Sequence, residues 1–241
     1  MSKNIIIGIK AQKRLLKDVC DIIRKPLTSD GIYYIHNEDN ILEGYALLVG
    51  PSDTCYQDGI YLFSFRFPAD YPFSPPVVKF HTHDGVSRFH PNLYRTGKVC
   101  LSLLNTWKGE QWTSTQTIRS ILLTLITLFN NNPLINEPGF SKNDKYCEPY
   151  RRSIEFVNYK TAILNMLTQK SLPPTFYGFF PIIKSIIAER KSDIMNRIKQ
   201  HTETDDEPSS LYVKVYNMTT IINYKKLQQD LTLVLSNLYK N

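Results

Sequence analysis

The sequence contains no apolar run long enough to span a membrane. Its first ten residues, MSKNIIIGIK, also lack the long apolar stretch and the small-residue cleavage site of a secretion signal. We therefore expect a cytoplasmic protein, with a nuclear location as the alternative, and no membrane partner.

Cysteine is scarce and widely spaced. The chain holds four cysteines, Cys20, Cys55, Cys100 and Cys147, and none of them forms the CxxC pair of a zinc site. In a reducing compartment they should remain free thiols, and the default for each is a small buried apolar residue. His81 and His83 alternate beside a predicted strand, but a third ligand is lacking, so no metal site is predicted.

Recognisable nucleic-acid-binding motifs are absent as well. The formal net charge is +7, yet the basic residues are dispersed along the chain. A solvated surface with a basic bias explains this charge more simply than DNA or RNA binding does. Electrostatic steering toward an acidic protein partner is a third interpretation.

The sequence does contain enough apolar residues for a core. Hydrophobic residues make up 42% of the 241 residues and charged residues 21%, which is ordinary for a soluble globular protein. A chain of this length can fold without disulfides, either as one domain with an extension or as two small domains.

The first half of the chain predicts an α+β arrangement. Apolar residues recur at helical spacing from about residue 9 to residue 25, and Pro26 ends the helix. Four β-rich segments follow at 33–36, 45–49, 60–67 and 77–80. Because short links join them, we predict an antiparallel meander, with Ser64 and Arg66 marking the polar side of the third strand.

A second helix is predicted at 115–129. One of its faces is apolar and consists of Ile118, Ile121, Leu122, Leu125 and Phe129. Leu123 lies on the opposite side among polar residues, so we expect it to be exposed.

The last third of the chain is also predicted to be folded. Helices are expected at about 146–168, 181–200 and 224–240, a polar loop at 202–208 and a strand at 211–216. The helices carry apolar stripes that must be buried, which excludes a solvated tail.

The most informative residues are His90-Pro91-Asn92, which are followed after seven residues by Cys100. The chain here resembles the ubiquitin-conjugating enzyme family, whose hallmark is this motif at this distance before the active cysteine. Supporting matches are Gly50-Pro51, Tyr56-Gln57-Asp58-Gly59, the stretch 67–72, Pro75-Pro76 and Trp112. The stretches 98–102, 106–109 and 136–140 look like the Z-type branch, which is known for a folded C-terminal extension.

The resemblance implies a fold and an activity. The expected fold is a four-stranded antiparallel meander flanked by an N-terminal helix and C-terminal helices, in a conjugating core at 1–165, with a mainly helical extension at 166–241. The implied activity is to accept ubiquitin or a ubiquitin-like protein from an activating enzyme as a thioester. The modifier then passes to a lysine of a target protein or to a ubiquitin ligase. Since the activating enzyme uses the ATP, no cofactor is expected.

The resemblance also assigns roles at the reacting centre. Cys100 would carry the thioester, because a thiol accepts an acyl group and remains a good leaving group. Asn92, a neutral amide, would stabilise the tetrahedral oxyanion or fix the loop that does so, an effect of about 10²–10³ in rate. His90 and Pro91 are expected to hold the turn rather than to act as a base.

Around this centre the sequence departs from the common members of the family. Ser102 and Asn136 stand where those members have acidic residues that position or deprotonate the incoming lysine. The loop between Cys100 and Trp112 is longer, which implies a different wall beside the cysteine.

Partner contacts are also implied by the resemblance. Ser114 replaces a proline in the loop that contacts ligases, while Phe73 keeps the other usual contact position. Leu123 is expected to contact the donor ubiquitin. The docking face for the activating enzyme is expected to comprise Lys10, Lys13, Arg14 and Lys17.

Two other functions remain open at this point. An inactive scaffold of the same fold would generally lack the cysteine, whereas Cys100 and Asn92 are both present. A basic nucleic-acid-binding protein would show salt-dependent binding to DNA or RNA.

Overall fold

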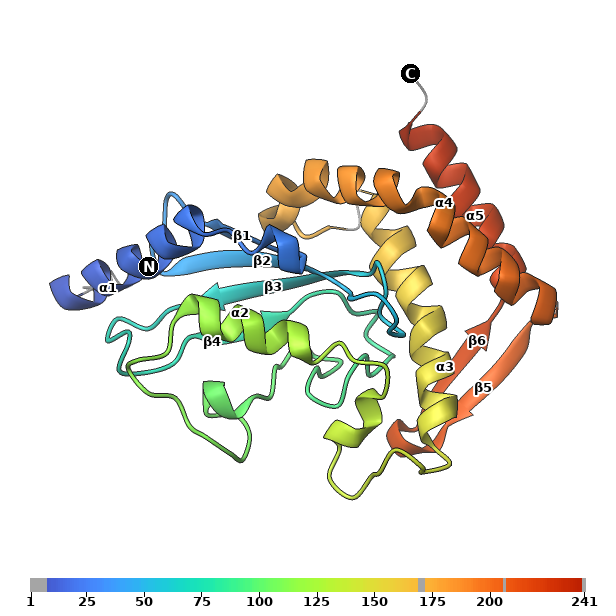
Figure 1. Cartoon of the computed structure of the whole chain (residues 1–241), viewed down its shortest axis with the longest axis horizontal. Coiled ribbons are helices and arrows are strands. Elements are labelled where there is room, and N and C mark those ends of the chain that lie inside the picture. The colour runs from blue at the N-terminus through green and yellow to red at the C-terminus, as the bar shows by residue number, and fades with distance from the viewer. Residues whose placement is uncertain (1–7, 169–171, 206, 240–241) are drawn as a thin grey trace, which may run out of the picture.

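The four predicted strands form one antiparallel sheet in the computed structural model, which describes residues 8–168, 172–205 and 207–239. They are β1 (Ile32–His36), β2 (Glu43–Val49), β3 (Ile60–Arg66) and β4 (Val77–Phe80), and they pair in the order of the sequence. Short links between antiparallel neighbours allow this order without a crossover. The predicted meander is therefore confirmed (Figure 1).

One face of the sheet carries the main hydrophobic core. Its buried side chains from β3 are Tyr61, Phe63 and Phe65. They pack toward α2 (Ile118–Thr127), and Tyr61 stacks on Phe129 with 4.2 Å between the ring centroids. Helix α1 (Ile9–Arg24) lies beside α2, where Arg119 contacts the carboxylate of Asp21 at 2.7 Å. Both predicted helices of the first half are thus present.

The other face of the sheet is partly covered by C-terminal elements, as Figure 1 shows for α4. Ser64 and Arg66 are not fully buried on this face, but Ile60 and Leu62 are completely buried there. These two side chains belong to a second hydrophobic cluster that includes Phe176, Phe179 and Ile183. The prediction that this face of the third strand is polar is therefore correct only for its second half, which contains Ser64 and Arg66. The covering residues are distant in sequence, so the alternation within β3 could not reveal them.

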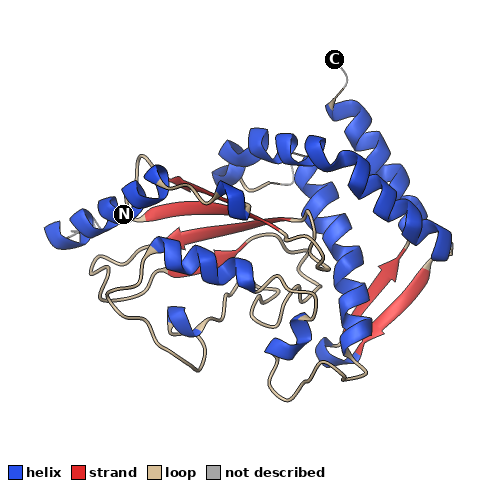
Figure 2. Ribbon diagram, in the orientation of Figure 1, coloured by secondary structure: helices blue, strands red, loops and turns tan. Residues whose placement is uncertain are grey.

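The C-terminal third is mainly helical, as expected (Figure 2). Its elements are α3 (Cys147–Val157), a π-helical turn (Asn158–Leu164), α4 (Phe180–Thr204), β5 (Ser209–Val213), β6 (Met218–Ile222) and α5 (Tyr224–Leu238). Short 3₁₀ turns at Asn165–Leu167 and Pro174–Phe179 precede α4. No helix within the described residues combines the length and the apolar character that crossing a membrane requires.

Three details of this region differ from the prediction. The polar loop expected at 202–208 begins later, because α4 continues to Thr204. The strand expected at 211–216 instead spans Ser209–Val213, and β6, which pairs with β5 across a 3₁₀ turn, was not predicted although four of its five residues are β-branched. Asn217 follows this turn with a φ of 47°, a conformation that asparagine tolerates. The Asn-Gly or Asp-Gly pair that usually marks a hairpin is absent here.

Two arginines of α4 attach the C-terminal region to a core loop through one buried carboxylate. Asp58 accepts from Nη1 of Arg190 at 2.8 Å and also from Arg197, and its side chain is only 6% exposed. A carboxylate removed from water in this way requires charged partners. Asn158 strengthens the junction, because its Nδ2 donates to the carbonyl oxygen of Gln57 at 2.9 Å.

We expect Asp58→Asn to lower the free energy of unfolding by about 3 kcal/mol, because it leaves two partly buried arginines without their anion. Asparagine tolerates the φ of 61° at this position, so the backbone is kept. Urea denaturation followed by circular dichroism measures the change. Asp53→Asn is the matched control, because Asp53 has a φ of 60° but an exposed side chain. Equal effects of the two substitutions would contradict the anchoring role of Asp58.

Candidate active site

The motif residues 90–92 form a tight turn in the irregular segment after β4. The amide of Asn92 donates to Nδ1 of His90 at 3.0 Å, and the amide of Leu93 donates to the carbonyl oxygen of His90 at 2.9 Å. Pro91 between them has a restricted φ and no N–H to satisfy. His90 and Asn92 are both buried. These contacts fix the backbone on both sides of Asn92.

Cys100 returns to this turn through a reversal of the chain at Gly97. A Cβ atom at Gly97 would lie 2.6 Å from the carbonyl oxygen of Phe80, and its φ is 82°, so only glycine fits. The amide of Cys100 donates to the carbonyl oxygen of Asn92 at 2.9 Å. In return, Nδ2 of Asn92 donates to the carbonyl oxygen of Cys100 at 2.7 Å. The fold thus brings together the two residues to which the sequence assigned the chemistry.

The other three cysteines have different surroundings. Cys55 lies in the core, where burial raises the pKa of its thiol, and Sγ of Cys147 lies 3.2 Å from the carbonyl oxygen of Ser141. Cys20 is exposed on α1, which corrects the default expectation that each cysteine is buried. It lies outside the apolar stripe of that helix. Cys100 itself is 2% exposed.

The side chain of Asn92 is suited to stabilising charge that forms beside the cysteine. Its donor atom Nδ2 is fixed on the backbone of Cys100, whereas the buried Oδ1, which has no partner in the described part of the chain, is an acceptor and does not itself stabilise an anion. A neutral donor held in place before the reaction needs no reorganisation when an oxyanion forms nearby. The arrangement fits either of the two roles predicted for Asn92.

His90 is a poor general base in this arrangement. Burial, helped by the nearby charge of Arg88, lowers the pKa of His90 to about 3, so its ring is neutral at neutral pH. The lone pair on Nδ1 is already used by the amide of Asn92. These observations favour the predicted role of His90 in holding the turn.

The low pKa of His90 predicts an acid-dependent loss of stability. Its unfolded-state pKa is near 6.5, so the unfolded chain binds a proton that the folded chain refuses as the pH falls from 6.5 toward 3. We expect His90→Asn, whose Oδ1 can still accept from Asn92, to remove about 1.4 kcal/mol per pH unit from this slope. Urea denaturation between pH 4.5 and about 7.5 tests this difference. Parallel pH profiles for the two proteins would contradict it.

A loop at 105–111 closes over the segment that follows Cys100. Oγ1 of Thr106 accepts from the amide of Leu101 at 2.9 Å and lies 3.0 Å from the carbonyl oxygen of Val99, so one hydroxyl bridges both neighbours of the cysteine. The sequence predicted a different loop here but not this role of Thr106. The open groove along the loop, about 660 Å³ in volume, is lined by Asn105, Thr106, Trp107, Lys108, Gln111 and Pro138.

The two positions that lack the family's acidic residues both lie next to these elements. Nδ2 of Asn136 is 3.4 Å from Nε2 of His90, and Ser102 follows the cysteine closely in a 3₁₀ turn that Gly109 of the loop approaches. Neither side chain is a carboxylate. Glu137, the next residue after Asn136, accepts a hydrogen bond from the hydroxyl of Tyr216 at 2.7 Å.

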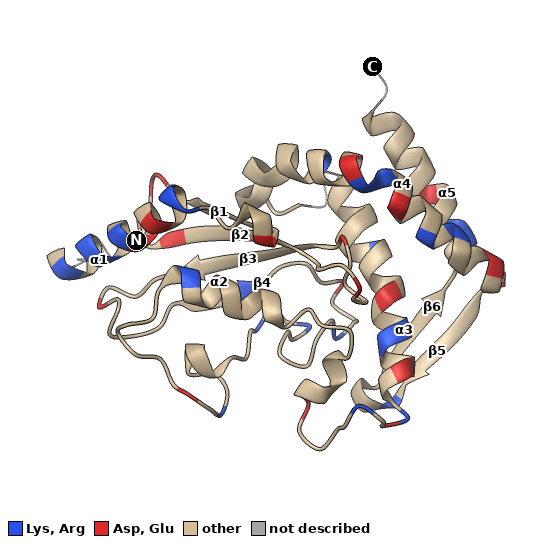
Figure 3. Ribbon diagram, viewed as in Figure 1, with Lys and Arg blue, Asp and Glu red and all other residues tan. Residues whose placement is uncertain are grey.

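The basic face predicted for α1 divides into two parts. Its exposed cations are Lys10, Lys13 and Lys17, and Figure 3 shows the basic residues along α1. Arg14 is turned toward the body of the protein instead. Its Nη1 donates to the carbonyl oxygen of Ser114 at 2.6 Å, and its Nη2 to that of Gln116 at 2.5 Å. Arg14 therefore ties α1 to the loop before α2.

The predicted contact residues for a ligase and for the donor modifier are accessible. Phe73 is 72% exposed, and Ser114 is exposed on a second loop. Nε1 of Trp112, on the loop of Ser114, donates to the carbonyl oxygen of Pro72, on the loop of Phe73, at 2.7 Å and so joins the two loops. Leu123 is 39% exposed on α2, as its helical phase predicted. The C-terminal extension does not bury it.

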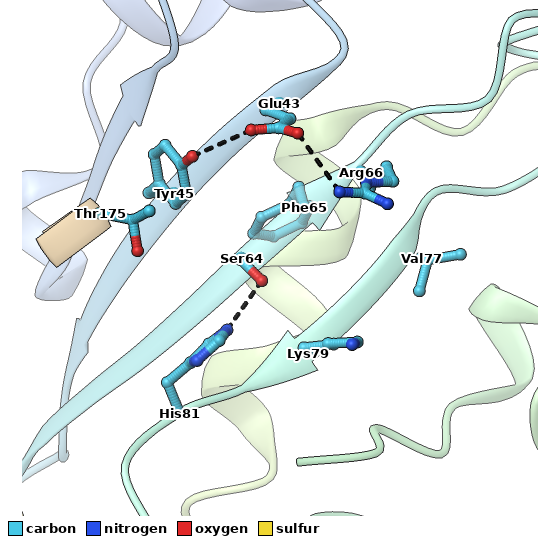
Figure 4. Close-up of a pocket in the computed structure, with 9 residues that line it drawn as sticks. All are labelled: Glu43, Tyr45, Ser64, Phe65, Arg66, Val77, Lys79, His81 and Thr175. Carbon is cyan, nitrogen blue, oxygen red and sulfur yellow. Dashed lines mark hydrogen bonds and ion pairs between the residues drawn. The ribbon is translucent and has the colours of Figure 1, made fainter. Parts of the chain in front are cut away.

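A second groove lies on the open half of the outer sheet face, and Figure 4 shows the side chains that line it. Ser64 and Nε2 of His81 lie 2.8 Å apart there, but the carboxylate of Glu43 bonds to Tyr45 and Arg66 rather than to His81. Burial lowers the pKa of His81 to about 4. The pair thus lacks the acid of a catalytic triad. Within the described residues, no group of three or more potential metal ligands was found.

Known proteins match this chain over much of its length. The family model described as "Ubiquitin-conjugating enzyme" matches residues 14–159, which include the motif turn and Cys100. The chain belongs to the ubiquitin-conjugating enzyme family. Among similar proteins, ubiquitin-conjugating enzyme E2 Z of Danio rerio is 39% identical over 190 residues, which cover 73% of this chain and 57% of that protein. E2 Z of Homo sapiens is 38% identical over 160 residues, which cover 65% of this chain and 45% of that protein.

The predicted Z-type branch of the ubiquitin-conjugating enzymes is confirmed by these relatives. A more distant match is the probable ubiquitin-conjugating enzyme protein 17 of Caenorhabditis elegans, 37% identical over 172 residues, which cover 66% of this chain and 24% of that protein. The chain spans about half the length of the curated E2 Z proteins it matches.

Proposed function

We propose that this ubiquitin-conjugating enzyme is active and carries ubiquitin, or a related modifier, as a thioester on Cys100. In the loading step, the Cys100 thiolate attacks the thioester carbonyl on an activating enzyme and displaces the thiolate of that enzyme. In the transfer step, a lysine amine attacks the new thioester. A C–N bond forms, the C–S bond breaks, Cys100 leaves as the thiolate, and the nitrogen gives its proton to solvent.

The reciprocal hydrogen bonds between Asn92 and Cys100 are the observation that carries this proposal. They hold an amide donor next to the residue whose acyl group would develop an oxyanion. An inactive scaffold has no need of either side chain. The dispersed basic residues give no support to a nucleic-acid-binding function.

The missing acidic residues shape the transfer step in this proposal. Ser102 and Asn136 can position an incoming amine by hydrogen bonds, but neither can take its proton at neutral pH. The acceptor must therefore lose its proton to solvent or to a partner. The groove beside Trp107 offers an open approach for an acceptor on the side of the long loop.

The proposed partners are an activating enzyme, a ligase and the donor modifier. Lys10, Lys13 and Lys17 would contact the activating enzyme, whereas Arg14 would hold α1 in place through its bonds to the loop before α2. Phe73 and Ser114 would contact a ligase, and Leu123 would contact the donor modifier. These exposed side chains lie on α1, on the two joined loops and on α2.

The division of the basic face leads to a prediction about loading. We expect Lys13→Glu to raise the enzyme concentration needed for half-maximal charging about threefold, since exposed rim charges act mainly on association. Added salt should produce the same shift in the wild type. Arg14→Gln should instead lower the melting temperature, because it breaks contacts with the loop before α2. Unchanged charging of Lys13→Glu at low salt would mean that the exposed lysines are only solvated surface.

The proposed activity is tested by a charging reaction. The chain is mixed with ubiquitin, an activating enzyme and ATP, and the products are separated on a non-reducing gel. A band heavier by one ubiquitin, which disappears when a reductant is added, supports the proposal. No such band, with either ubiquitin or ubiquitin-like modifiers and their activating enzymes, would contradict it.

A further inference from the structure

The two carbonyl groups of the motif turn are held by one arginine. Nε of Arg88 donates to the carbonyl oxygen of His90 at 3.1 Å, and Nη2 donates to the carbonyl oxygen of Pro91 at 2.6 Å. Both carbonyls lie immediately before Asn92 in the chain. A planar guanidinium that bridges two consecutive carbonyl groups fixes their relative orientation. It thereby fixes the position of the backbone that leads into Asn92.

Arg88 is in turn held between Tyr94 of the core and the C-terminal hairpin. Its guanidinium carbon lies 3.3 Å from the ring centroid of Tyr94 and 5.3 Å from that of Tyr216, which belongs to the turn between β5 and β6. The amide of Arg88 also faces Sδ of Met218, the first residue of β6, at 3.3 Å. Tyrosine faces attract a guanidinium through their electron-rich rings.

Tyr216 contacts other parts of the active-site surroundings at the same time. Its carbonyl oxygen accepts from Nη2 of Arg95 at 2.6 Å, in the segment between Asn92 and Cys100. Its hydroxyl donates to Glu137 at 2.7 Å, directly after Asn136. Tyr216 therefore contacts the chain before the motif, the chain after it, and the residue next to the position of a missing acid.

We propose that Tyr216 is a positioning residue for the transfer step, through which the C-terminal hairpin holds the motif turn and Asn92 in place. The proposal rests on the function proposed above for Cys100. Loading is the less demanding step, because a thiolate is both the attacking and the leaving group. Attack by an amine depends more on a correctly placed donor for the oxyanion, so a displaced turn slows transfer more than loading.

The test compares the wild type with three variants of the full chain, which are Tyr216→Ala, Tyr216→Phe and Tyr212→Ala. Tyr212 is the matched control, because it lies on the same hairpin, is 56% exposed, and its hydroxyl donates to Oδ1 of nearby Asn217 at 3.0 Å. Each variant is charged with ubiquitin, and discharge to free lysine is followed in a single turnover. We expect Tyr216→Ala to discharge about tenfold more slowly at nearly unchanged loading, since small displacements at a reacting centre have large effects on rate.

Tyr216→Phe keeps the ring over Arg88 and should restore most of the discharge rate, and Tyr212→Ala should behave as the wild type. Wild-type discharge by Tyr216→Ala, or an equal loss of loading and discharge, would overturn the proposal. If Tyr216→Ala does not fold, Arg88→Lys serves instead, because lysine keeps the charge but cannot bridge both carbonyls. It should show the same selective loss of discharge, and equal losses there would also overturn the proposal.

A measurement on the uncharged chain separates this proposal from the proposed function. Hydrogen exchange at the amides of Asn92 and Leu93, which are bonded to His90, should be faster in Tyr216→Ala and unchanged in Tyr212→Ala. Unchanged exchange in Tyr216→Ala would overturn the positioning role, whether or not the chain can be charged. Failure of wild-type charging, with the exchange effect present, would contradict only the proposed function.

Discussion

Cys100→Ala is expected to abolish the reductant-sensitive ubiquitin adduct completely. No second thiol can take over, because Cys55 is buried with a raised pKa and Cys147 is buried against Ser141. Cys20 is exposed, but it lies on α1 and takes no part in the turn that the motif forms with Cys100. The charging reaction on a non-reducing gel measures the loss.

The serine variant provides the chemical control. An acyl group on Cys100→Ser would be an oxyester, which survives a reductant that cleaves a thioester, and it should form more slowly because a hydroxyl is a weaker nucleophile. Cys20→Ser should load as the wild type does. A normal thioester band from Cys100→Ala would show that the chemistry lies on another cysteine.

Asn92→Ala is expected to slow the discharge of charged Cys100 to free lysine by on the order of 100-fold, the usual effect of removing one oxyanion donor. Loading should change far less, because thiolate exchange between two thioesters makes a smaller demand on that donor. Single-turnover loading and discharge, measured separately, give the two rates.

Asn136→Ala is a matched control for this prediction, since Asn136 is a second amide that contacts His90 but has no bond to Cys100. We expect a smaller effect on discharge from it. If Asn92→Ala lost loading and discharge equally, together with a large drop in melting temperature, Asn92 would serve only to hold the fold.

Much of the fold was predictable because its signals are local. The meander follows from β-rich segments separated by glycine and proline, and the phase of α2 placed Leu123 outside the buried face. The motif and Cys100 were predicted as a pair through the resemblance to the family, and the structure explains their spacing as one chain reversal, in which Gly97 adopts a left-handed conformation. Each of these signals lies within a short stretch of sequence.

The features that the sequence did not reveal depend on contacts between distant residues. The outer face of β3 reads as half polar, yet Ile60 and Leu62 are buried there by the C-terminal region. Arg88 and Tyr216 carry no pattern that would link them before the fold brings them together. Hairpin β5–β6 was missed because its turn is a 3₁₀ turn ending at Asn217 rather than a two-residue hairpin turn.

The different roles of the basic residues on α1 also depend on contacts between distant residues. The cations of α1 look equivalent in the sequence, and the resemblance to the family placed Arg14 and Lys13 together in one docking face. The structure separates them, because a guanidinium can reach the two carbonyls of Ser114 and Gln116 while the lysine ammonium stays in water. Composition could not make this distinction.

The central claim, that the modifier is carried on Cys100, is tested most directly by mapping the adduct on the wild-type chain with all four cysteines present. The charged protein is digested with pepsin at low pH, which preserves thioesters, and the peptides are identified by mass spectrometry. We predict that the C-terminal remnant of the modifier is found only on the peptide that contains Cys100. A remnant on Cys20, Cys55 or Cys147, with Cys100 free, would contradict this account.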